Sequence, residues 1–290
     1  MTDHDDIAWI GVAWGHTTLR AWAFRADGSV REARSGKADA KGAFGPALDL
    51  LLKGLPSAAP VICCGWKDAD TPRAATPCPP PGGRDARRFE WSRPVYLLPG
   101  IAQAAPPELM GTGVVRIRGY LAQEPEFDGI LCLPGARTIW AHISAGEIVS
   151  FRSFLTGELL ALLAEHSSLG ALMANGDWDS AAFDTALDDA TARPEALAAQ
   201  LSGLDARALL DGQSPAQTRS RLFGLLIGAE LAAARPYWLG QNVAILGDDG
   251  ALSTAYSAAL SRQGVPTTPA DAEQALLSGL RATYAEAVTG

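Results

Sequence analysis

The chain has 290 residues, of which 48% are hydrophobic and 19% charged, and its formal net charge is -8. A chain of this size buries a large core and is expected to divide it between two domains. The acidic balance excludes a basic surface for nucleic acid and disfavours an anionic membrane as a partner.

The N-terminal residues 1–6 are acidic and polar, without the apolar core of a signal peptide. No later apolar run reaches membrane-spanning length without a glycine, a proline or a charge. We therefore expect a cytoplasmic protein with no nucleic-acid partner and no membrane partner.

A polar turn at Gly15–Thr18 separates two β-prone runs, 7–13 and 19–24, and a third such run begins at Val30. This order predicts a β-meander. Glycine lets a ligand approach the backbone closely, and threonine and backbone N–H groups donate hydrogen bonds. The turn therefore has the shape of a phosphate loop, with Gly15, His16, Thr17 and Thr18 as its candidate residues. An ordinary hairpin is the alternative, and the turn taken alone favours it.

Helical spacing of apolar residues predicts a helix over Ala43–Leu52, and the apolar run Val61–Cys64 predicts a strand. The proline-rich stretch Gly65–Pro94 is expected to be a loop, followed by a strand at Val95–Leu98. The loop carries three arginines, interpreted as solvated with an anionic ligand as the alternative: Arg84, Arg87 and Arg88.

The four cysteines, Cys63, Cys64, Cys78 and Cys132, have no Cys-x-x-Cys spacing, and the four histidines form no ligand cluster with them. We therefore expect neither a metal site nor a disulfide framework. Burial in strands explains the cysteines that end or interrupt apolar runs.

The meander is repeated in the second half of the chain. Residues 127–133, 139–143 and 148–154 are β-prone and are separated by turns in the same order as in 7–34. This duplication predicts two similar domains. The first of these turns supplies a second set of phosphate-loop-like candidates, Gly135, Ala136, Arg137 and Thr138. If the domains face each other across a cleft, the two turns are expected to hold one polyphosphate from both sides.

The chain beyond residue 154 is mostly helical. Thr156 is expected to cap a helix that runs to about Glu165, with Glu158 in its first turn, where the helix dipole favours a carboxylate. A further helix is expected over Ser180–Leu187.

Ser214–Gln217 has the serine cap, the proline and the capping-box glutamine of a helix start. In the helix that follows, Gly224 and Gly228 leave a smooth stripe for close packing, which would indicate a homodimer if it is exposed. A last helix is expected over about 269–288 and is predicted to pack back on the N-terminal domain.

A strand at Val243–Leu246, a glycine-flanked turn at Gly247–Gly250 and a helix at Ala251–Leu260 form an arrangement common at nucleotide sites. The nucleotide-binding candidates are Gly247, Asp248 and Gly250. Asp248 and Asp249 either accept hydrogen bonds from ribose hydroxyls or cap the helix, and capping is the favoured interpretation.

Segments along nearly the whole chain resemble the 2-dehydro-3-deoxygalactonokinase family, sugar-acid kinases of the actin, hexokinase and Hsp70 superfamily. They are Trp14–Gly15 with Thr17 and 19–22, Pro77–Pro79, Leu98–Ile101, Cys132–Gly135 with Trp140, Phe154–Leu159, His166–Ser167 with Leu169–Gly170, and Gly224–Leu231. Because so many segments occur in order, the resemblance is specific.

The resemblance implies an α/β fold of two duplicated RNase-H-like, actin-like domains with mixed five-stranded-type sheets around a central cleft. The expected domains are 1–105 and 106–268. The resemblance also implies transfer of the ATP γ-phosphate to the 6-hydroxyl of 2-dehydro-3-deoxygalactonate with Mg²⁺, and substrate-binding roles for Arg20, Thr156 and Glu158.

The chain departs from the family pattern at the expected site. The family's first loop reads Asp-Trp-Gly-Thr-Thr, whereas this chain has Ala13 and His16 at the Asp and first Thr positions. Gly111–Arg116 replaces Arg-Gly-Glu-Glu-Thr-Gln, and Gly135–Trp140 replaces Gly-Thr-His-Ser-Lys-Trp. We assign no catalytic residue firmly, since Glu158 and Asp68 are only weak candidates.

Phosphoryl transfer depends on positioned donors and on charge stabilisation, and loss of one such group commonly lowers the rate by about 10²- to 10⁴-fold. The sequence therefore predicts a kinase with weak or absent turnover and, because of Ala13, impaired Mg²⁺ handling. The alternative is a non-catalytic member, a pseudokinase that binds a sugar acid or a nucleotide in a regulatory role.

Overall fold

The computed structural model describes residues 6–15, 18–37, 43–66, 71–173, 177–248 and 250–289. The chain divides into two compact units. Unit 1 contains residues 1–127, 144–150 and 272–290, and unit 2 contains 128–143 and 151–271. The domain boundaries expected at residues 105 and 268 stay a prediction.

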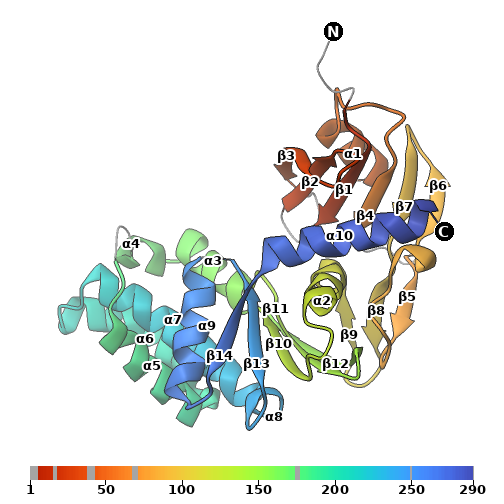
Figure 1. The fold of residues 1–290 in the computed structure, drawn as a ribbon. Coiled ribbons are helices and arrows are strands. Elements are labelled where there is room, and N and C mark those ends of the chain that lie inside the picture. Colours follow the sequence, from red (N-terminus) through yellow and green to blue (C-terminus); the bar gives the residue numbers. More distant parts are fainter. Residues whose placement is uncertain are drawn as a thin grey trace. The chain divides into compact units, whose positions relative to one another are not determined.

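Unit 1 is built on a six-stranded sheet in the order β3-β2-β1-β4-β7-β6 (Figure 1). Its strands are β1 (Trp9–Trp14), β2 (Thr18–Phe24), β3 (Val30–Lys37), β4 (Val61–Cys64), β6 (Arg87–Glu90) and β7 (Pro94–Leu97). The first three form the predicted antiparallel meander, and β4 and β7 continue the sheet parallel to β1. Helix α1 (Phe44–Leu51) packs its buried leucines into the core on one face of this sheet.

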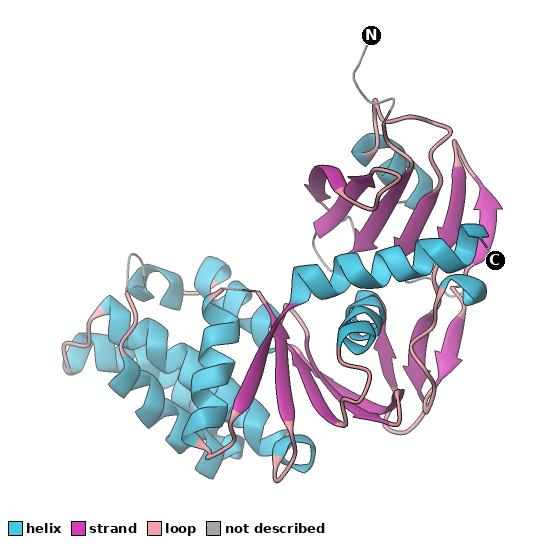
Figure 2. Cartoon of the chain, viewed as in Figure 1, coloured by secondary structure: helices cyan, strands magenta, loops and turns pink. Residues whose placement is uncertain are grey.

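The helices α2 (Thr112–Gln123) and α10 (Ala272–Thr289) lie side by side in unit 1 (Figure 2). Their close approach depends on glycine. A Cβ atom at Gly119 would lie 1.8 Å from the Ala275 carbonyl oxygen, and one at Gly279 would lie 2.1 Å from the Val115 carbonyl oxygen. A small sheet of β5 (Arg73–Ala75), β8 (Gly100–Gln103) and β9 (Glu108–Met110), and the 3₁₀ turn η1 (Gly83–Asp85), complete the unit.

The second sheet has five strands in the order β12-β11-β10-β13-β14. They are β10 (Gly129–Leu133), β11 (Thr138–Ser144), β12 (Glu147–Phe154), β13 (Val243–Gly247) and β14 (Thr267–Asp271). Strands β13 and β14 run parallel to β10, as β4 and β7 run parallel to β1. The predicted duplication of an antiparallel meander is therefore confirmed, within a mixed α/β fold.

The helices of unit 2 are α3 (Thr156–His166), α4 (Leu169–Met173), α5 (Ser180–Ala192), α6 (Leu197–Leu210), α7 (Pro215–Ala233), α8 (Arg235–Trp238) and α9 (Ala251–Arg262), with the 3₁₀ turn η2 (Pro194–Ala196). The predicted capping box of α7 is confirmed between Ser214 and Gln217. The glycine stripe of α7 is covered by α5, since a Cβ at Gly228 would lie 2.6 Å from the Leu187 carbonyl oxygen. The stripe therefore gives no support for a homodimer.

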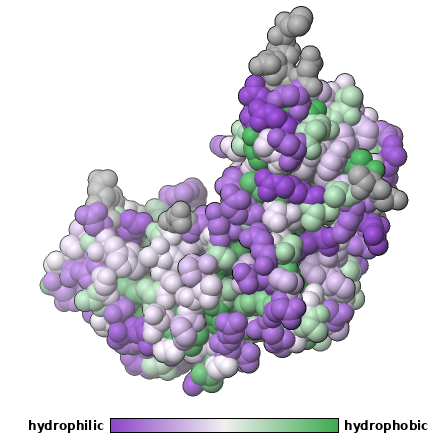
Figure 3. All heavy atoms as spheres, viewed as in Figure 1, coloured by the Kyte–Doolittle hydropathy of each residue, from purple (hydrophilic) through white to green (hydrophobic). Residues whose placement is uncertain are grey.

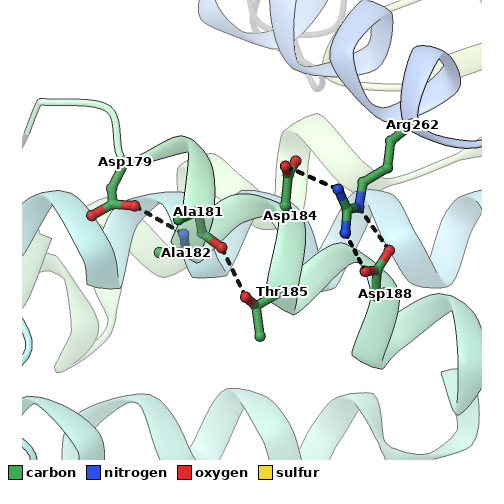
Figure 4. Close-up of polar contacts among 7 residues, drawn as sticks. All are labelled: Asp179, Ala181, Ala182, Asp184, Thr185, Asp188 and Arg262. Atoms are coloured by element: carbon green, nitrogen blue, oxygen red, sulfur yellow. Dashed lines mark hydrogen bonds and ion pairs between the residues drawn. The ribbon is translucent and has the colours of Figure 1, made fainter.

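Helix α9 is tied to α5 at its C-terminal end (Figure 4). The Arg262 guanidinium donates to both carboxylate oxygens of Asp188, at 2.9 and 2.6 Å, and to Asp184 at 3.1 Å. At the start of α5, Asp179 accepts a hydrogen bond from the Ala182 N–H at 2.9 Å. These contacts fix the C-terminal end of α9 against α5.

Three local predictions were wrong. The stretch Gly65–Pro94 is not one loop, since β5 and β6 lie within it and Cys78 forms a β-bridge with Ile148. The last helix begins at Ala272, because the residues before it form β14, an edge strand that tolerates Pro269 without an N–H donor. Thr156 is the first residue of α3 rather than its cap, and its side chain points into the core.

Cys63, Cys64 and Cys132 are buried strand residues, as predicted. Burial raises the pKa of Cys64 to about 12 and also raises the pKa of Cys132, so these thiols are unreactive near neutral pH. On the face drawn in Figure 3, hydrophilic and hydrophobic residues are interspersed. Among the described residues, no helix combines the length and the apolar character needed to cross a membrane.

The packing of α7 on α5 predicts opposite effects of the same substitution at two helical glycines. A Cβ at Gly224 would lie 2.5 Å from the Phe183 carbonyl oxygen, whereas one at Gly203 of α6 meets no heavy atom within 4 Å. We expect Gly224→Ala to lower the free energy of unfolding by about 1–3 kcal/mol through overpacking. We expect Gly203→Ala to raise it by up to about 1 kcal/mol through helix propensity. Urea unfolding measures both, and equal effects would contradict this account.

Candidate functional site

The carboxyl ends of β10, β13 and β14 lie at one edge of the unit 2 sheet because the three strands are parallel. Ligands of open α/β sheets bind at this edge, where loops and helix starts meet. The loop 134–137 follows β10, Asp248 follows β13, and Asp271 ends β14. The structure therefore places two of the predicted candidate segments on neighbouring strands.

The first turn of α3 is seated on the loop 134–137. The Glu158 N–H donates to the Ala136 carbonyl oxygen at 2.8 Å. A Cβ at Gly157 would lie 2.1 Å from the Gly135 carbonyl oxygen, so only glycine allows this approach. Arg137 is exposed and Glu158 is partly exposed. Candidates from two separate parts of the sequence, the loop with Ala136 and Arg137 and the helix start with Glu158, thus lie in one place.

The hydroxyls of Thr138 and Thr156 face the core instead of this surface. Thr138 is fully buried, and its Oγ1 lies 2.9 Å from the Tyr256 hydroxyl oxygen. Thr156 is 5% exposed, and its hydroxyl donates to Glu230. Neither side chain is open to a ligand, so these residues act through the elements that they begin.

Glu230 of α7 is the centre of this buried polar cluster and is only 3% exposed. Its carboxylate accepts hydrogen bonds from the Trp140 indole N–H at 2.7 Å, from the Tyr256 hydroxyl at 2.6 Å and from the Thr156 hydroxyl. Burial raises the pKa of Glu230, and the three hydrogen bonds oppose this shift. All three partners are donors, which is the arrangement that an ionised carboxylate requires.

A pocket of about 350 Å³ lies beside α9 at the same sheet edge. This volume falls within the range of roughly 300–1,000 Å³ that is typical of small-ligand sites. The pocket is lined by Ile245, Gly247, Asp248, Ser253, Thr254, Ser257, Pro269, Ala270 and Asp271. Its hydroxyls and carboxylates suit the hydroxyl-bearing part of a ligand better than phosphate groups, which the carboxylates repel.

Asp248 folds back on its own turn. Its Oδ1 accepts hydrogen bonds from the Gly250 N–H at 3.1 Å and from the Ser253 hydroxyl at 3.3 Å. The N-cap of α9 is Gly250, and it has no side-chain cap hydrogen bond, so the capping interpretation is wrong for Asp248, whose carboxylate instead holds the segment before the helix. Asp249 lies outside the described residues.

The first loop follows β1 in unit 1. The Gly15 N–H donates to the Thr18 carbonyl oxygen at 2.8 Å, which closes the turn. Gly65, which follows β4, has a φ of +86°, and a Cβ there would lie 2.2 Å from the Trp14 carbonyl oxygen. The Thr112 hydroxyl at the start of α2 donates to the same oxygen at 2.8 Å. His16, Thr17 and Asp68 lie outside the described residues.

Ala13 is 5% exposed and lies in an apolar cluster with Leu276 and Leu277 of α10. Its partner across the hairpin is Arg20, whose guanidinium donates to Glu273 at 2.7 Å. Glu273 also accepts a hydrogen bond from the Trp22 indole N–H at 3.2 Å. Arg20 thus forms an ion pair with Glu273 of the same unit.

Sequence reasoning missed Glu273 and Glu230 as parts of these sites. Glu273 lies 253 residues from its partner Arg20, and no local pattern links the two. Glu230 did leave a signal, because it is the single charge in the apolar and small-residue run Gly224–Leu231. Within the described part of the chain, no group of three or more His, Cys, Asp or Glu side chains is placed to hold a metal ion.

The model of the 2-keto-3-deoxy-galactonokinase family matches residues 13–283. A probable 2-dehydro-3-deoxygalactonokinase of Rhizobium meliloti (strain 1021) is 31% identical over 292 residues, covering 93% of this chain and 94% of the relative. The 2-dehydro-3-deoxygalactonokinase of Escherichia coli (strain K12) is 26% identical over 287 residues, covering 94% and 96%.

A crystal structure from Sinorhizobium meliloti, of a protein whose proposed activity is 2-dehydro-3-deoxygalactonokinase, matches with a TM-score of 0.85 and 29% identity over 96% of both chains. Component A of (R)-2-hydroxyglutaryl-CoA dehydratase from Acidaminococcus fermentans matches with a TM-score of 0.51 and 13% identity, covering 96% and 98%. This second likeness concerns the fold alone and confirms the predicted actin-like ATPase fold. The chain belongs to the 2-keto-3-deoxy-galactonokinase family.

Proposed function

We propose that this protein binds ATP and a 2-keto-3-deoxy sugar acid and phosphorylates the 6-hydroxyl of the acid with low turnover. The observation that supports this most is the meeting of the loop 134–137, the first turn of α3 and the pocket beside α9 at one edge of one sheet. This edge offers separate places for a sugar acid and for a nucleotide.

The nucleotide is assigned to the pocket beside α9. Gly247 keeps the backbone free of a side chain there, and the Ser253 and Ser257 hydroxyls supply donors and acceptors for a ribose. Asp271 adds an acceptor for ribose hydroxyls at the end of β14. This assignment leaves the phosphates to extend away from the carboxylates of the pocket.

The sugar acid is assigned to the loop 134–137 and the start of α3. The exposed Arg137 guanidinium matches a carboxylate in charge and shape, and Glu158 accepts hydrogen bonds from sugar hydroxyls. Arg20 is proposed as a further substrate-binding residue in unit 1, although its guanidinium is paired with Glu273. The Thr156 side chain contributes only by fixing the helix start.

Low turnover is inferred from position 13. The family pattern that the sequence resembles has Asp at this position, and Mg²⁺ is held in proteins by oxygen ligands such as carboxylates. Here a methyl group packs against apolar side chains of α10. The described residues that pack around position 13 are apolar and do not fit a divalent cation. The same observation supports the alternative, a non-catalytic sensor of the sugar acid or nucleotide.

A coupled ADP-release assay with ATP, Mg²⁺ and 2-keto-3-deoxygalactonate tests the proposed reaction. Typical kinases turn over at about 1–100 s⁻¹. We expect a rate well below about 1 s⁻¹ that depends on the sugar acid, because a charge-stabilising carboxylate is missing. The control is the same assay without sugar acid. Turnover in the normal range would overturn the low-rate proposal, and absence of thermal stabilisation by either ligand would overturn the binding assignments.

Restoring a carboxylate at position 13 tests the cause of the low rate. We expect Ala13→Asp to raise kcat by at least about tenfold, since one well-placed group is commonly worth about 10²- to 10⁴-fold. Ala13→Asn has nearly the same size without the charge and serves as the matched control. Equal rates for the two variants, both folded by circular dichroism, would show that the missing charge does not limit turnover.

A further inference from the structure

Glu230 accepts hydrogen bonds from three elements that begin at the candidate site. The carboxylate is buried on α7 and accepts one hydrogen bond each from β11, α3 and α9. These partners are 90, 74 and 26 residues away in the sequence, respectively. Burying a carboxylate costs substantial desolvation free energy. The hydrogen bonds of Glu230 therefore explain why it is found in the core.

One hydrogen bond leads to the acceptor side of the site. Thr156 donates to the carboxylate from the first position of α3, where the helix dipole also favours a negative charge. Two residues further along, the Glu158 N–H is bonded to Ala136 in the loop 134–137. The position of Glu158 and of this loop therefore depends on how Thr156 is held.

A second hydrogen bond leads to the nucleotide side. Tyr256 is fully buried on α9, and burial beside Glu230 raises its pKa, so its hydroxyl stays protonated and donates to the carboxylate. With that proton committed, the Tyr256 oxygen accepts the hydrogen bond from Thr138 at the start of β11. The neighbouring turn of α9 presents Ser253 and Ser257 to the pocket.

The third hydrogen bond fixes the carboxylate itself. The Trp140 indole N–H donates to Oε1 at 2.7 Å, while the two hydroxyls share Oε2. The two ligand sides are therefore connected through separate bonds to one oxygen. Either bond can be removed without deleting the other.

We propose that Glu230 is a positioning residue that aligns the start of α3 with α9, and thereby sets the sugar-acid side and the nucleotide side of the site relative to one another. This inference rests on the proposed function for the identity of the two ligands. The residue touches neither ligand and acts through Thr156 and Tyr256.

Variants that each remove one of the two hydroxyl hydrogen bonds to Glu230 test this proposal by equilibrium titration of the full-length protein. We expect Tyr256→Phe to weaken binding of a non-hydrolysable ATP analogue by about tenfold, because α9 then loses its hydrogen bond to Glu230. Binding of 2-keto-3-deoxygalactonate is expected to stay within about twofold. Thr156→Val is expected to show the reverse pattern. Glu230→Gln is expected to weaken both, since the neutral amide has one acceptor oxygen where the carboxylate has two and cannot accept all three hydrogen bonds in the present arrangement.

Trp238→Phe is the matched control for a general loss of stability. Trp238 is 3% exposed, belongs to the same core as Trp140 and Tyr256, and donates its indole N–H to the Leu231 carbonyl oxygen at 2.8 Å. This variant loses a buried hydrogen bond to the residue after Glu230 but removes no hydrogen bond made by α3 or α9. We expect a lower melting temperature and unchanged binding of both ligands.

The outcomes separate the two proposals. If Tyr256→Phe and Thr156→Val lower stability as Trp238→Phe does but leave both binding constants unchanged, or weaken both equally, the positioning role is wrong. Tyr256→Phe and Thr156→Val decide this even if Glu230→Gln fails to fold. If the unmodified protein binds both ligands but releases no ADP, the kinase reaction fails while the positioning role is still measured.

Discussion

The buried carboxylate of Glu230 is the interaction on which the second unit of the structure depends. The carboxylate does not stabilise α7 itself, because the backbone hydrogen bonds of this helix form without a charged side chain in the core. Its three hydrogen-bond donors come from a strand and two other helices, so the carboxylate is satisfied only when all of them are in place. A single buried charge therefore specifies one arrangement of β11, α3, α7 and α9.

Close backbone contacts at glycine give the same specificity without charge. Gly157 lets α3 rest on the loop 134–137, Gly224 and Gly228 let α7 lie against α5, and Gly119 and Gly279 let α2 meet α10. In each case a single methyl group would collide with a backbone oxygen or nitrogen, which moves less easily than a side chain. The elements that carry the candidate site are thus placed by backbone fit as well as by hydrophobic burial.

The first loop is held by backbone contacts and by apolar packing. The hairpin of β1 and β2 is closed by the Gly15 turn, and Thr112 and Gly65 meet the end of β1. Ala13 fits this frame as an apolar core residue. Because Ala13 packs as an apolar residue in this frame, the fold of the first loop does not depend on a carboxylate at position 13.

The sequence by itself determined what depends on neighbouring residues: the two meanders, the strand Val61–Cys64, the capping box of α7 and the family. It also placed the loop 134–137 and Glu158 among the candidates, through spacing and resemblance. Only the tertiary structure showed that β6 and β14 are strands, because edge pairing supplies what the charged sequence of β6 and the proline-containing sequence of β14 lack locally. It also turned Thr138 and Thr156 inward, since their partners Tyr256 and Glu230 lie far away in the chain and leave no local pattern.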